Sequence, residues 1–434
     1  MSATAPLRRS TSPRRRTIRH FRWYICALLL YATTVNYMDR MVLGILEPVI
    51  AQDLHWSNTS YGLITGVFQI GYAVMMPIAG RLIDWLGLRV GYSLATLLWS
   101  LSSMSHALAR TAAQFALARL GLGLGEAANF PACIKAVADW FPRRERALAT
   151  GIFNGGSNLG AILAPLAVPL VTARFGWHAA FIFTGSLSLS WVVLWLLIYR
   201  EPEQHPRLSP EELALIRSDS DAVSAESVPY RRLLGKRAAW AFFAAKFLTD
   251  PVWWFYLFWL PPFLHRGYGL DLVHLGAPLI TIYAASAVGS VAGGWLSSAL
   301  LKSGCTVAKA RKIAMLVCAL CVVAVVFVPR AAGNLWLTVA LIAIAAAAHQ
   351  GWSANLFTVV SDCFPRKAVG SVVGLGGLGG AIGGALVQPA IGKWLDFSGG
   401  AYGPIFLVAG TIYLVALLIV HLLLPAFARV QVES

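Results

Sequence analysis

Long apolar runs separated by short polar stretches make up most of this chain. About twelve of them follow one another, each close to the ~20 residues that span the hydrocarbon of a bilayer. They lie near 23–46, 60–82, 90–109, 112–136, 147–171, 178–199, 238–264, 273–300, 312–329, 335–361, 368–392 and 402–426. The pattern predicts an all-α integral membrane protein with twelve transmembrane helices and both chain ends on the same side of the membrane.

One polar interruption divides the runs into two groups of six. Between the sixth and seventh runs, Arg200–Arg237 contains several acidic residues and breaks the apolar pattern. Within it, Ser209-Pro210-Glu211-Glu212 is typical of a helix start, with serine as the N-cap and proline in the first turn. The predicted organisation is a disordered basic cytoplasmic arm at 1–20, a six-helix bundle at 21–200, a cytoplasmic linker at 201–237, a second six-helix bundle at 238–427 and a cytoplasmic tail at 428–434.

Composition and charge support a membrane protein. Of the 434 residues, 58% are hydrophobic and 12% are charged, whereas about a quarter are charged in soluble domains. The net charge is +16, and the cations gather in clusters that fall on one side if the spans alternate, the cytoplasmic side by the positive-inside rule. The clusters are Arg8–Arg19, Arg143–Arg146, Arg231–Arg237, Lys309–Lys312 and Arg366–Lys367. This distribution excludes nucleic acid as the reason for the charge. The first run continues beyond a signal-peptide core without a clean cleavage site, so we expect a retained helix.

A seven-residue motif occurs once in each half. Ala138–Arg144 is matched by Ser361–Lys367, which share the order aspartate, any residue, phenylalanine, proline and a basic pair, at an offset of 362 − 139 = 223. The same offset maps glycines of the fifth run onto glycines of the eleventh and places His349 at the position of Glu126. Two parallel six-helix repeats are the arrangement of major facilitator transporters, whose substrate site lies between the halves near the middle of the membrane.

The loop after the second run resembles the loop signature of major facilitator transporters through Gly80, Asp84, Gly87 and Arg89. The glycines permit a tight turn, and we expect Asp84 to accept hydrogen bonds from Arg89 and from a helix N-terminus. These contacts would pin the cytoplasmic ends of helices and act as a conformational latch. The alternative is an ordinary basic loop, and the matching loop of the second half lacks the aspartate.

Ionisable side chains inside the predicted spans are the leading functional candidates. Arg119 and Glu126 lie seven residues apart on nearly the same helix face, and the glycines between them leave room for a neighbouring helix or a ligand. By the helical rise, Asp39 lies about as deep as Arg119, and Glu126 lies near the midplane. Ions at this depth face protein or a water-filled cavity. Proton occupancy of such a carboxyl can respond to whether an anion occupies the arginine, which a proton-coupled carrier requires. The alternatives are a purely structural Arg119–Glu126 pair and an exposed interfacial Asp39–Arg40 pair.

Further polar side chains lie inside other runs. They are Asn154, Ser157 and Asn158 in the fifth run and His349, Gln350, Ser353 and Asn355 in the tenth. Uncharged donors and acceptors suit a polyhydroxylated substrate, and their alternative role is hydrogen bonding between helices. Tyr72 in the second run could donate to a carboxylate or simply pack. Lys246 and Asp250 in the seventh run are four residues apart, and we expect them to pair with each other.

Five segments together resemble the hexuronate and aldonate transporters of the anion:cation symporter family. They are Asn36–Arg40, Arg119–Ala127, Asp139–Pro142, Asp250–Trp254 and His349–Phe357. The resemblance runs from about residue 20 to 425. It assigns a carboxylate and proton site to Asp39, Arg40, Tyr72, Arg119 and Glu126. Ser157 stands where galactonate carriers of the family have glutamine, whereas the tenth run is hexuronate-like and points to glucuronate or galacturonate.

We therefore expect a proton-coupled symporter that imports a sugar-acid monoanion, a hexuronate such as galacturonate or glucuronate, by alternating access. It is expected to be a monomer in the lipid of a bacterial inner membrane and not an enzyme. The six cysteines stand singly, so no metal site, disulfide framework or cofactor is predicted. No phosphate-binding loop with the pattern Gly-x-x-x-x-Gly-Lys-Ser/Thr occurs, so ATP is not the expected energy source.

The sequence leaves alternatives to a hexuronate symporter. Within transport, the alternative substrate is another organic anion, such as an aldonate, glucarate or an aromatic carboxylate. A non-transporting membrane sensor is the alternative from a different class, and a large appended signalling domain would favour it. A drug–proton antiporter is disfavoured, because arginines in the cavity suit anions.

Overall fold

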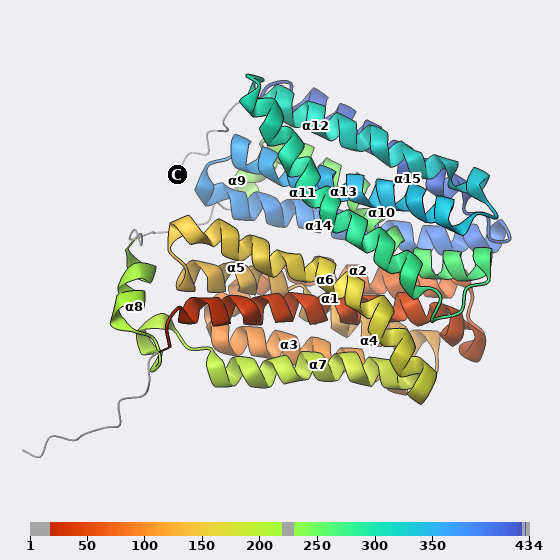
Figure 1. The fold of residues 1–434 in the computed structure, drawn as a ribbon, viewed down its shortest axis with the longest axis horizontal. Helices are drawn as coiled ribbons and strands as arrows, with labels where there is room; N and C mark the ends of the chain where they lie inside the picture. Colours follow the sequence, from red (N-terminus) through yellow and green to blue (C-terminus); the bar gives the residue numbers. More distant parts are fainter. Residues whose placement is uncertain (1–17, 219–229, 428–429, 431–434) are drawn as a thin grey trace, which may run out of the picture.

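The structure is a computed structural model that describes residues 18–218, 230–427 and 430, and in these it is all-helical (Figure 1). The predicted basic arm up to residue 17 and the predicted tail apart from Val430 lie outside the described residues. The helices form two halves, with the first (red to yellow-green) below the second (green to blue) in Figure 1. The prediction of an all-α fold built from two six-helix bundles is confirmed.

The spans follow the order that the apolar runs predict. The first half contains α1 (Phe21–Leu54), α2 (Asn58–Leu86), α3 (Leu88–Ser105), η1 (His106–Leu108), α4 (Ala112–Glu126), α5 (Asn129–Trp140), α6 (Arg143–Phe175) and α7 (Trp177–Ile198). The linker contains η2 (Pro202–Gln204), α8 (Pro210–Arg217) and α9 (Tyr230–Leu234). The second half contains α10 (Arg237–Tyr268), α11 (Gly276–Lys302), α12 (Val307–Val322), η3 (Val323–Ala331), α13 (Leu335–Cys363), α14 (Arg366–Phe397) and α15 (Gly403–Leu423).

Eight of the described helices are long and apolar enough to cross a membrane by length and composition. They are α2, α6, α7, α11, α12 continued by η3, α13, α14 and α15. The other spans include α1, α4 and α10, which carry buried ions. α4 has 15 residues, because the fourth span is divided between α4 and α5.

Two spans depart from a continuous α-helix. The fourth is broken at Ala127–Ala128, directly after Glu126, so that α4 and α5 together form one span. The ninth begins at Val307, earlier than the apolar run suggests, and continues as the 3-10 helix η3 around Pro329. The apolar pattern predicted neither change, because a break of this kind does not alter the hydrophobicity of a run.

The repeated motif ends one helix and begins the next in both halves. Phe141 and Phe364 are the C-caps of α5 and α13. Pro142 and Pro365 are the N-caps of α6 and α14, with φ of −62° and −64°. The predicted turn between the fourth and fifth helices of each repeat is confirmed.

Close helix packing explains the glycines of α4. A Cβ at Gly123 would lie 2.2 Å from the backbone oxygen of Phe68 on α2, and a Cβ at Gly125 would lie 2.7 Å from the backbone nitrogen of Trp99 on α3. Small residues permit this approach of backbones in a membrane bundle. As the sequence suggested, neighbouring helices come close to the face that carries Arg119.

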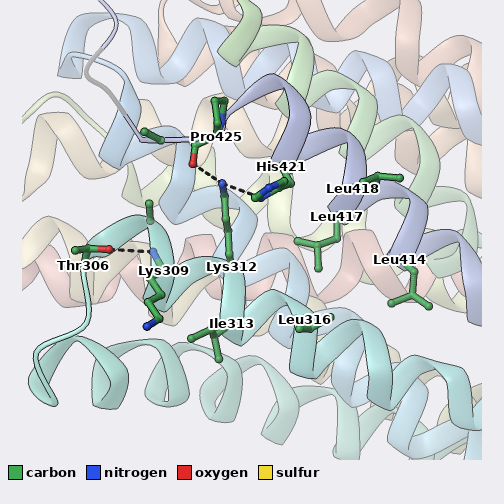
Figure 2. A pocket seen from close by; sticks show the side chains of 12 residues that line it. Thr306, Lys309, Lys312, Ile313, Leu316, Leu414, Leu417, Leu418, His421 and Pro425 are labelled. Carbon is green, nitrogen blue, oxygen red and sulfur yellow. Dashed lines mark hydrogen bonds between the residues drawn. The ribbon is translucent and has the colours of Figure 1, made fainter.

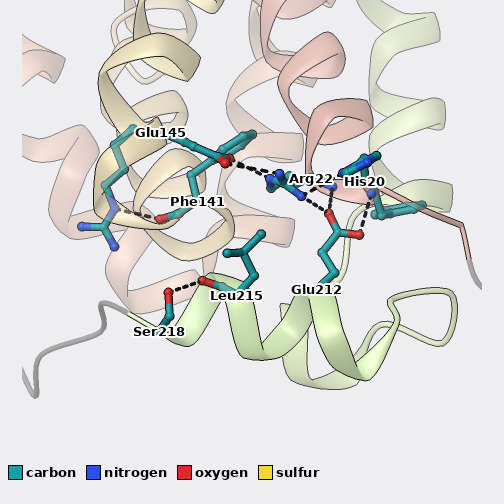
Figure 3. Close-up of polar contacts among 9 residues, drawn as sticks. His20, Arg22, Phe141, Glu145, Glu212, Leu215 and Ser218 are labelled. Atoms are coloured by element: carbon teal, nitrogen blue, oxygen red, sulfur yellow. Dashed lines mark hydrogen bonds and ion pairs between the residues drawn. The ribbon is translucent and has the colours of Figure 1, made fainter.

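The linker packs against the first half through a buried ion cluster (Figure 3). Glu212 of α8 accepts hydrogen bonds from the backbone nitrogens of Phe21 and Arg22 at 2.8 and 3.2 Å. Arg22 also donates from Nη1 to Glu212 and from Nε to Glu145 of α6, both at 2.8 Å. Ser209 accepts from the backbone nitrogen of Glu212, which confirms the predicted helix start. The cluster holds α8 to the beginnings of α1 and α6; we call this end of the molecule the linker end and the opposite end the distal end.

His205 lies beside this cluster. Its ring centroid is 4.1 Å from that of Phe21, and Nε2 lies 3.1 Å from the carbonyl oxygen of Ile198. Burial lowers the pKa of the His205 imidazole from its ordinary value of 6.5. The folded protein therefore favours the neutral imidazole. As the pH falls below the pKa of histidine in the unfolded chain, the unfolded chain binds a proton before the folded protein does, and the free energy of unfolding decreases.

Glu212→Ala should lower the free energy of unfolding by about 3 kcal/mol, because it leaves the buried Arg22 with a single carboxylate and removes the acceptor for the start of α1. Tryptophan fluorescence during denaturation of the detergent-purified protein measures the change. Glu211→Ala is the matched control, since Glu211 is exposed on the same helix. Equal stability of the two variants would contradict a stabilising role for the cluster.

Candidate functional site

An ion pair between α1 and α4 lies at the centre of the candidate site. Arg40 donates to Oε2 of Glu126 from Nε at 2.8 Å and from Nη2 at 2.6 Å, and it also donates to Asn36. The two side chains are only 3% and 0% exposed. The other carboxylate oxygen, Oε1, has no hydrogen-bond partner among the described residues. Glu126 therefore pairs with Arg40, so the alternative of a purely structural Arg119–Glu126 pair is wrong.

Aromatic rings from both halves enclose Arg40. Its guanidinium carbon lies 4.7–5.3 Å from four ring centroids. The rings belong to Tyr37, Phe68, Tyr72 and, from α10 of the second half, Trp254. Aromatic faces attract a cation at this distance. Tyr72, a predicted site residue, thus contributes its ring to the arginine, and Trp254 places Arg40 at the contact between the halves.

Arg119 is fully buried and has no carboxylate partner in the described part of the chain. Its Nη1 donates to the backbone oxygen of Arg40 at 3.1 Å, while Nε and Nη2 have no partner there. Its guanidinium carbon lies 5.8 Å from the ring of Phe68 and 6.0 Å from that of Phe258 in the second half. A buried donor without an acceptor costs about 1–3 kcal/mol, and more when it is charged. The arrangement suits an anionic ligand.

Asp39 points to the other side of α1 from Arg40. Its two carboxylate oxygens accept hydrogen bonds from Ser103 of α3 at 2.6 Å and from Ser188 of α7 at 2.5 Å. Both Asp39 and Arg40 are buried, so the alternative of an exposed interfacial pair is wrong. Successive residues of a helix are rotated by about 100° around its axis. The carboxylate of Asp39 therefore points into the first half, while the guanidinium of Arg40 lies at the contact between the halves.

Three further polar side chains between the halves are not among the predicted site residues. Gln69 of α2 is buried with neither side-chain atom paired, and the indole nitrogen of Trp254 and Nε2 of Gln388 also lack partners among the described residues. A Cβ at Gly384 of α14 would lie 3.1 Å from both Gln69 and Trp254, so these two side chains from different halves meet at Gly384. The available signal was a glutamine inside each of two apolar runs, near 60–82 and 368–392.

The predicted residues of α13 pack inside the second half. His349 is stacked on Trp253 at 5.1 Å, and its Nδ1 lies 2.5 Å from the hydroxyl of Tyr413. Asn355 donates to the backbone oxygens of Gly293 and Gly351, both at 2.9 Å. Gln350 and Ser353 are half-buried. The amide of Asn355 thus joins α13 to α11, which is the helix-to-helix role weighed above.

The predicted residues of α6 are more open than those of α13. Asn154 is exposed, while Ser157 and Asn158 are half-exposed. The hydroxyl of Ser157 donates to the backbone oxygen of Asn154 within the same helix. The structure does not bring these side chains into contact with the Arg40–Glu126 pair.

The expected pair in α10 is present. Lys246 and Asp250 are joined at 2.7 Å, and Nζ of Lys246 lies 4.9 Å from the ring of Phe357. Asp250 also faces Gly380 of α14, where an added Cβ would lie 2.1 Å from its carboxylate. The second half therefore carries a nearly buried ion pair of its own, opposite the ions of the first half.

The model of the Major Facilitator Superfamily matches residues 29–388. The chain belongs to the Major Facilitator Superfamily. It is thus a multi-pass membrane transporter, and the family predicted from its repeats and motifs is confirmed.

Three relatives of this chain are named as transporters of sugar acids. The chain is 30% identical over 427 residues to the hexuronate transporter of Escherichia coli strain K12, covering 96% of this chain and 98% of that one. It is 34% identical over 283 residues to the galacturonate transporter of Dickeya chrysanthemi, covering 64% and 82%. It is also 30% identical over 371 residues to a probable galactarate/D-glucarate transporter of E. coli strain K12, covering 81% and 83%.

A solved structure shares the fold. A bacterial homologue of the human lysosomal transporter Spinster, in an inward-facing and occupied conformation, matches with a TM-score of 0.73 at 20% identity, covering 94% of this chain and 97% of that one. At this identity the match establishes the major facilitator arrangement of helices.

The major facilitator loop between α2 and α3 differs from its prediction in one contact. Gly87 has φ of +75°, as the tight turn requires. Asp84, however, pairs with Lys135 of α5, and Arg89 donates to the backbone oxygen of Leu196 on α7 at 2.5 Å. The expected Asp84–Arg89 hydrogen bond was wrong, because both side chains reach neighbouring helices of the folded bundle. Near Gly80, an added Cβ would have open space.

Polar contacts join the two halves at the distal end. Asp396 of α14 accepts from the backbone and side-chain donors of Asn58 and Thr59 at the start of α2, at 2.6–3.1 Å. Arg266 of α10 donates to Asn58 and, at 2.5 Å, to Glu47 of α1. These contacts close the distal end of the major facilitator bundle in this conformation.

Proposed function

We propose that this protein is a proton-coupled symporter that imports a sugar-acid monoanion of the hexuronate class by alternating access. The observation that carries the proposal is the buried Arg119, whose Nε and Nη2 lack partners in the described chain beside the Arg40–Glu126 pair. The sugar-acid specificity of the relatives supports the substrate class. Another organic anion, such as an aldonate, glucarate or an aromatic carboxylate, is the alternative substrate.

In this proposal Arg119 binds the substrate carboxylate. Nε and Nη2 form one edge of the guanidinium, and such an edge can engage both oxygens of a carboxylate. Nη1 is already bonded to the backbone oxygen of Arg40, which orients the guanidinium plane. Phe258 of the second half also contacts the guanidinium of Arg119. A bound anion would therefore interact with both halves.

Proton coupling follows from competition for Arg40. With Glu126 charged, the pair is closed and the carboxylate competes with a substrate anion for the guanidinium. When Glu126 takes a proton, it no longer competes, and the anion can bind Arg40 as well as Arg119. Proton and substrate then favour each other's binding, and this coupling is reciprocal by linkage. Asp39, on the other side of α1, is the second proposed proton site.

Uncharged groups would recognise the hydroxyls of the sugar acid. Trp254, whose ring lies next to Arg40, and Gln69, which meets Trp254 at Gly384, offer unpaired donors and acceptors within the described chain. The half-open side chains of α6 and Gln350 and Ser353 of α13 are further candidates. A sugar ring would also pack on Trp254, which lies at the contact between the halves.

Alternating access would break the distal contacts and form contacts at the linker end. We place the linker end and both chain termini in the cytoplasm, following the positive-inside rule. The protein would act as a monomer in a bacterial inner membrane and move its substrate without converting it chemically.

Transport by the purified protein in proteoliposomes tests the proposal. The panel contains galacturonate, glucuronate, galactonate, glucarate and benzoate, each as an external solute with an imposed inward proton gradient. Concentrative uptake of hexuronates, abolished by a protonophore, is the expected result. Uptake of an aldonate or of benzoate alone would favour the alternative substrates, and binding without any uptake would favour a sensor.

Asp39→Asn should weaken proton-driven accumulation by tenfold or more while leaving the protein folded, because amide and acid have similar shapes and only the titration is removed. Accumulation against a concentration gradient is the measurement. Ser188→Ala is the control, since it removes one donor to Asp39 but retains the carboxyl group. Unchanged accumulation by Asp39→Asn would show that Asp39 is a structural acceptor for the serines of α3 and α7.

A further inference from the structure

A groove runs between α12 and α15 on the outer edge of the second half, at its linker end (Figure 2). Its volume is about 720 Å³, within the range of about 300–1,000 Å³ that ligand sites occupy. It lies on two helices that do not touch the Arg40–Glu126 pair. The proposed transport function therefore does not account for it.

The groove is cationic at one end and apolar at the other. Lys309 and Lys312 of α12 and His421 of α15 lie at the linker end, where the Lys312 ammonium points to His421 and that of Lys309 points away from it. Leu316 and Leu414 lie about two turns, or ~10 Å, further along the two antiparallel helices. Both walls thus change from basic to apolar in the same direction.

The two lysines make different contacts. Lys312 donates to the backbone oxygens of Leu424 and Pro425 at 2.7 and 2.8 Å, which fixes the end of α15 against α12. The ammonium group of Lys309 is exposed and has no partner in the described chain. The residues that line the groove include no aspartate or glutamate. Its polar end is therefore a site of positive charge with a free donor.

The apolar end of the groove lies on the outer surface of the helix bundle. Leu316, Leu414 and Leu418 are 41%, 36% and 56% exposed. In Figure 1, α12 lies along the upper edge of the molecule, away from the first half. For a membrane transporter this surface is bathed in acyl chains, and the basic end of the groove lies at the level of the lipid headgroups.

We propose that this groove is a specific site for an anionic phospholipid of the leaflet at the linker end. The phosphate would lie at the exposed ammonium of Lys309, with the charge of Lys312 one helical turn away, and one acyl chain would follow the leucines of α12 and α15. Basic pockets between transmembrane helices on the cytoplasmic side bind anionic headgroups through this combination. The inference goes beyond the proposed transport function and holds for any substrate.

Native mass spectrometry of the delipidated full-length protein in detergent tests the site. The probes are phosphatidylglycerol and phosphatidylethanolamine with the same acyl chains. Phosphatidylglycerol should bind more tightly, and Lys309→Gln should lower its affinity about fivefold, the effect of one lysine near an anionic headgroup. Lys302→Gln is the matched control, because it removes the same charge at the linker end of α11 but outside the groove.

A second pair of variants tests the apolar end. Leu418→Trp should fill the groove and reduce binding without changing charge, whereas Leu422→Trp, on the same helix but outside the lining, should bind normally. Glycerol 3-phosphate should compete poorly, since it lacks acyl chains. Full competition by glycerol phosphate, equal losses in variants and controls, or undiminished binding to Lys309→Gln and Leu418→Trp would each overturn the proposal.

Discussion

Arg119→Lys should lose most substrate uptake, by about 30-fold or more, although the positive charge is kept. Lysine offers a single compact ammonium, whereas the planar guanidinium presents two donors on one edge to a carboxylate. The loss of one hydrogen bond to a charged group corresponds to about 1.5–3 kcal/mol. The measurement is the initial rate of uptake in proteoliposomes, together with binding of the same sugar acid by thermal shift.

The variant must be compared at equal insertion and folding. Arg110→Lys is the matched control. It replaces the same side chain with lysine at an exposed position just before α4, away from the site. Near-normal transport by a correctly inserted Arg119→Lys protein would mean that Arg119 is structural or only sets the local electrostatic field. In that case Arg40 would have to carry the substrate carboxylate alone.

Glu126→Gln should separate substrate movement from proton coupling. The amide resembles the protonated acid, and its oxygen can still accept from Arg40, so binding and exchange across the membrane should persist. What should disappear is the pH dependence and the net concentrative uptake, a loss of tenfold or more in accumulation. Counterflow measured beside proton-driven uptake in the same proteoliposomes distinguishes the two activities.

Other outcomes assign different roles to Glu126. Loss of counterflow and binding together would make it a structural partner, now of Arg40 because the structure joins these two at 2.6 Å. Retained pH-driven accumulation would move the proton site elsewhere, with Asp39 and His349 as the next residues to test. Glu203→Gln on the linker is the control, because it removes a carboxylate outside the membrane spans.

Helix positions were predictable because they depend on local periodicity. Apolar runs of membrane-spanning length marked the spans, and the repeated Phe-Pro turn marked the register between the halves. The turn was found in both copies with nearly identical proline angles, φ of −62° and −64°. The break after Glu126 was not predictable, since Ala127 and Ala128 are as compatible with helix as their neighbours.

Partners of the ions were predicted less well than the ions themselves. The spacing of Arg119 and Glu126 left open a structural pair between them, but the carboxylate of Glu126 pairs with Arg40 on α1. In the same way Asp84 turns to Lys135 and away from Arg89. The spacing of residues along one helix determines only which of them share a face. A partner on another helix depends on how the two helices are rotated against each other, so neither partner could be read from the sequence.

The sequence by itself determined the membrane class, the two parallel repeats and the superfamily. These properties follow from hydrophobic length and from one helical rise per residue, which need no knowledge of neighbours. Only the tertiary structure decided that Arg119 keeps two unpaired nitrogens in the described chain and that Gln69 and Trp254 meet between the halves. Such facts depend on which side chains of separate helices meet, and packing of the whole bundle sets those contacts.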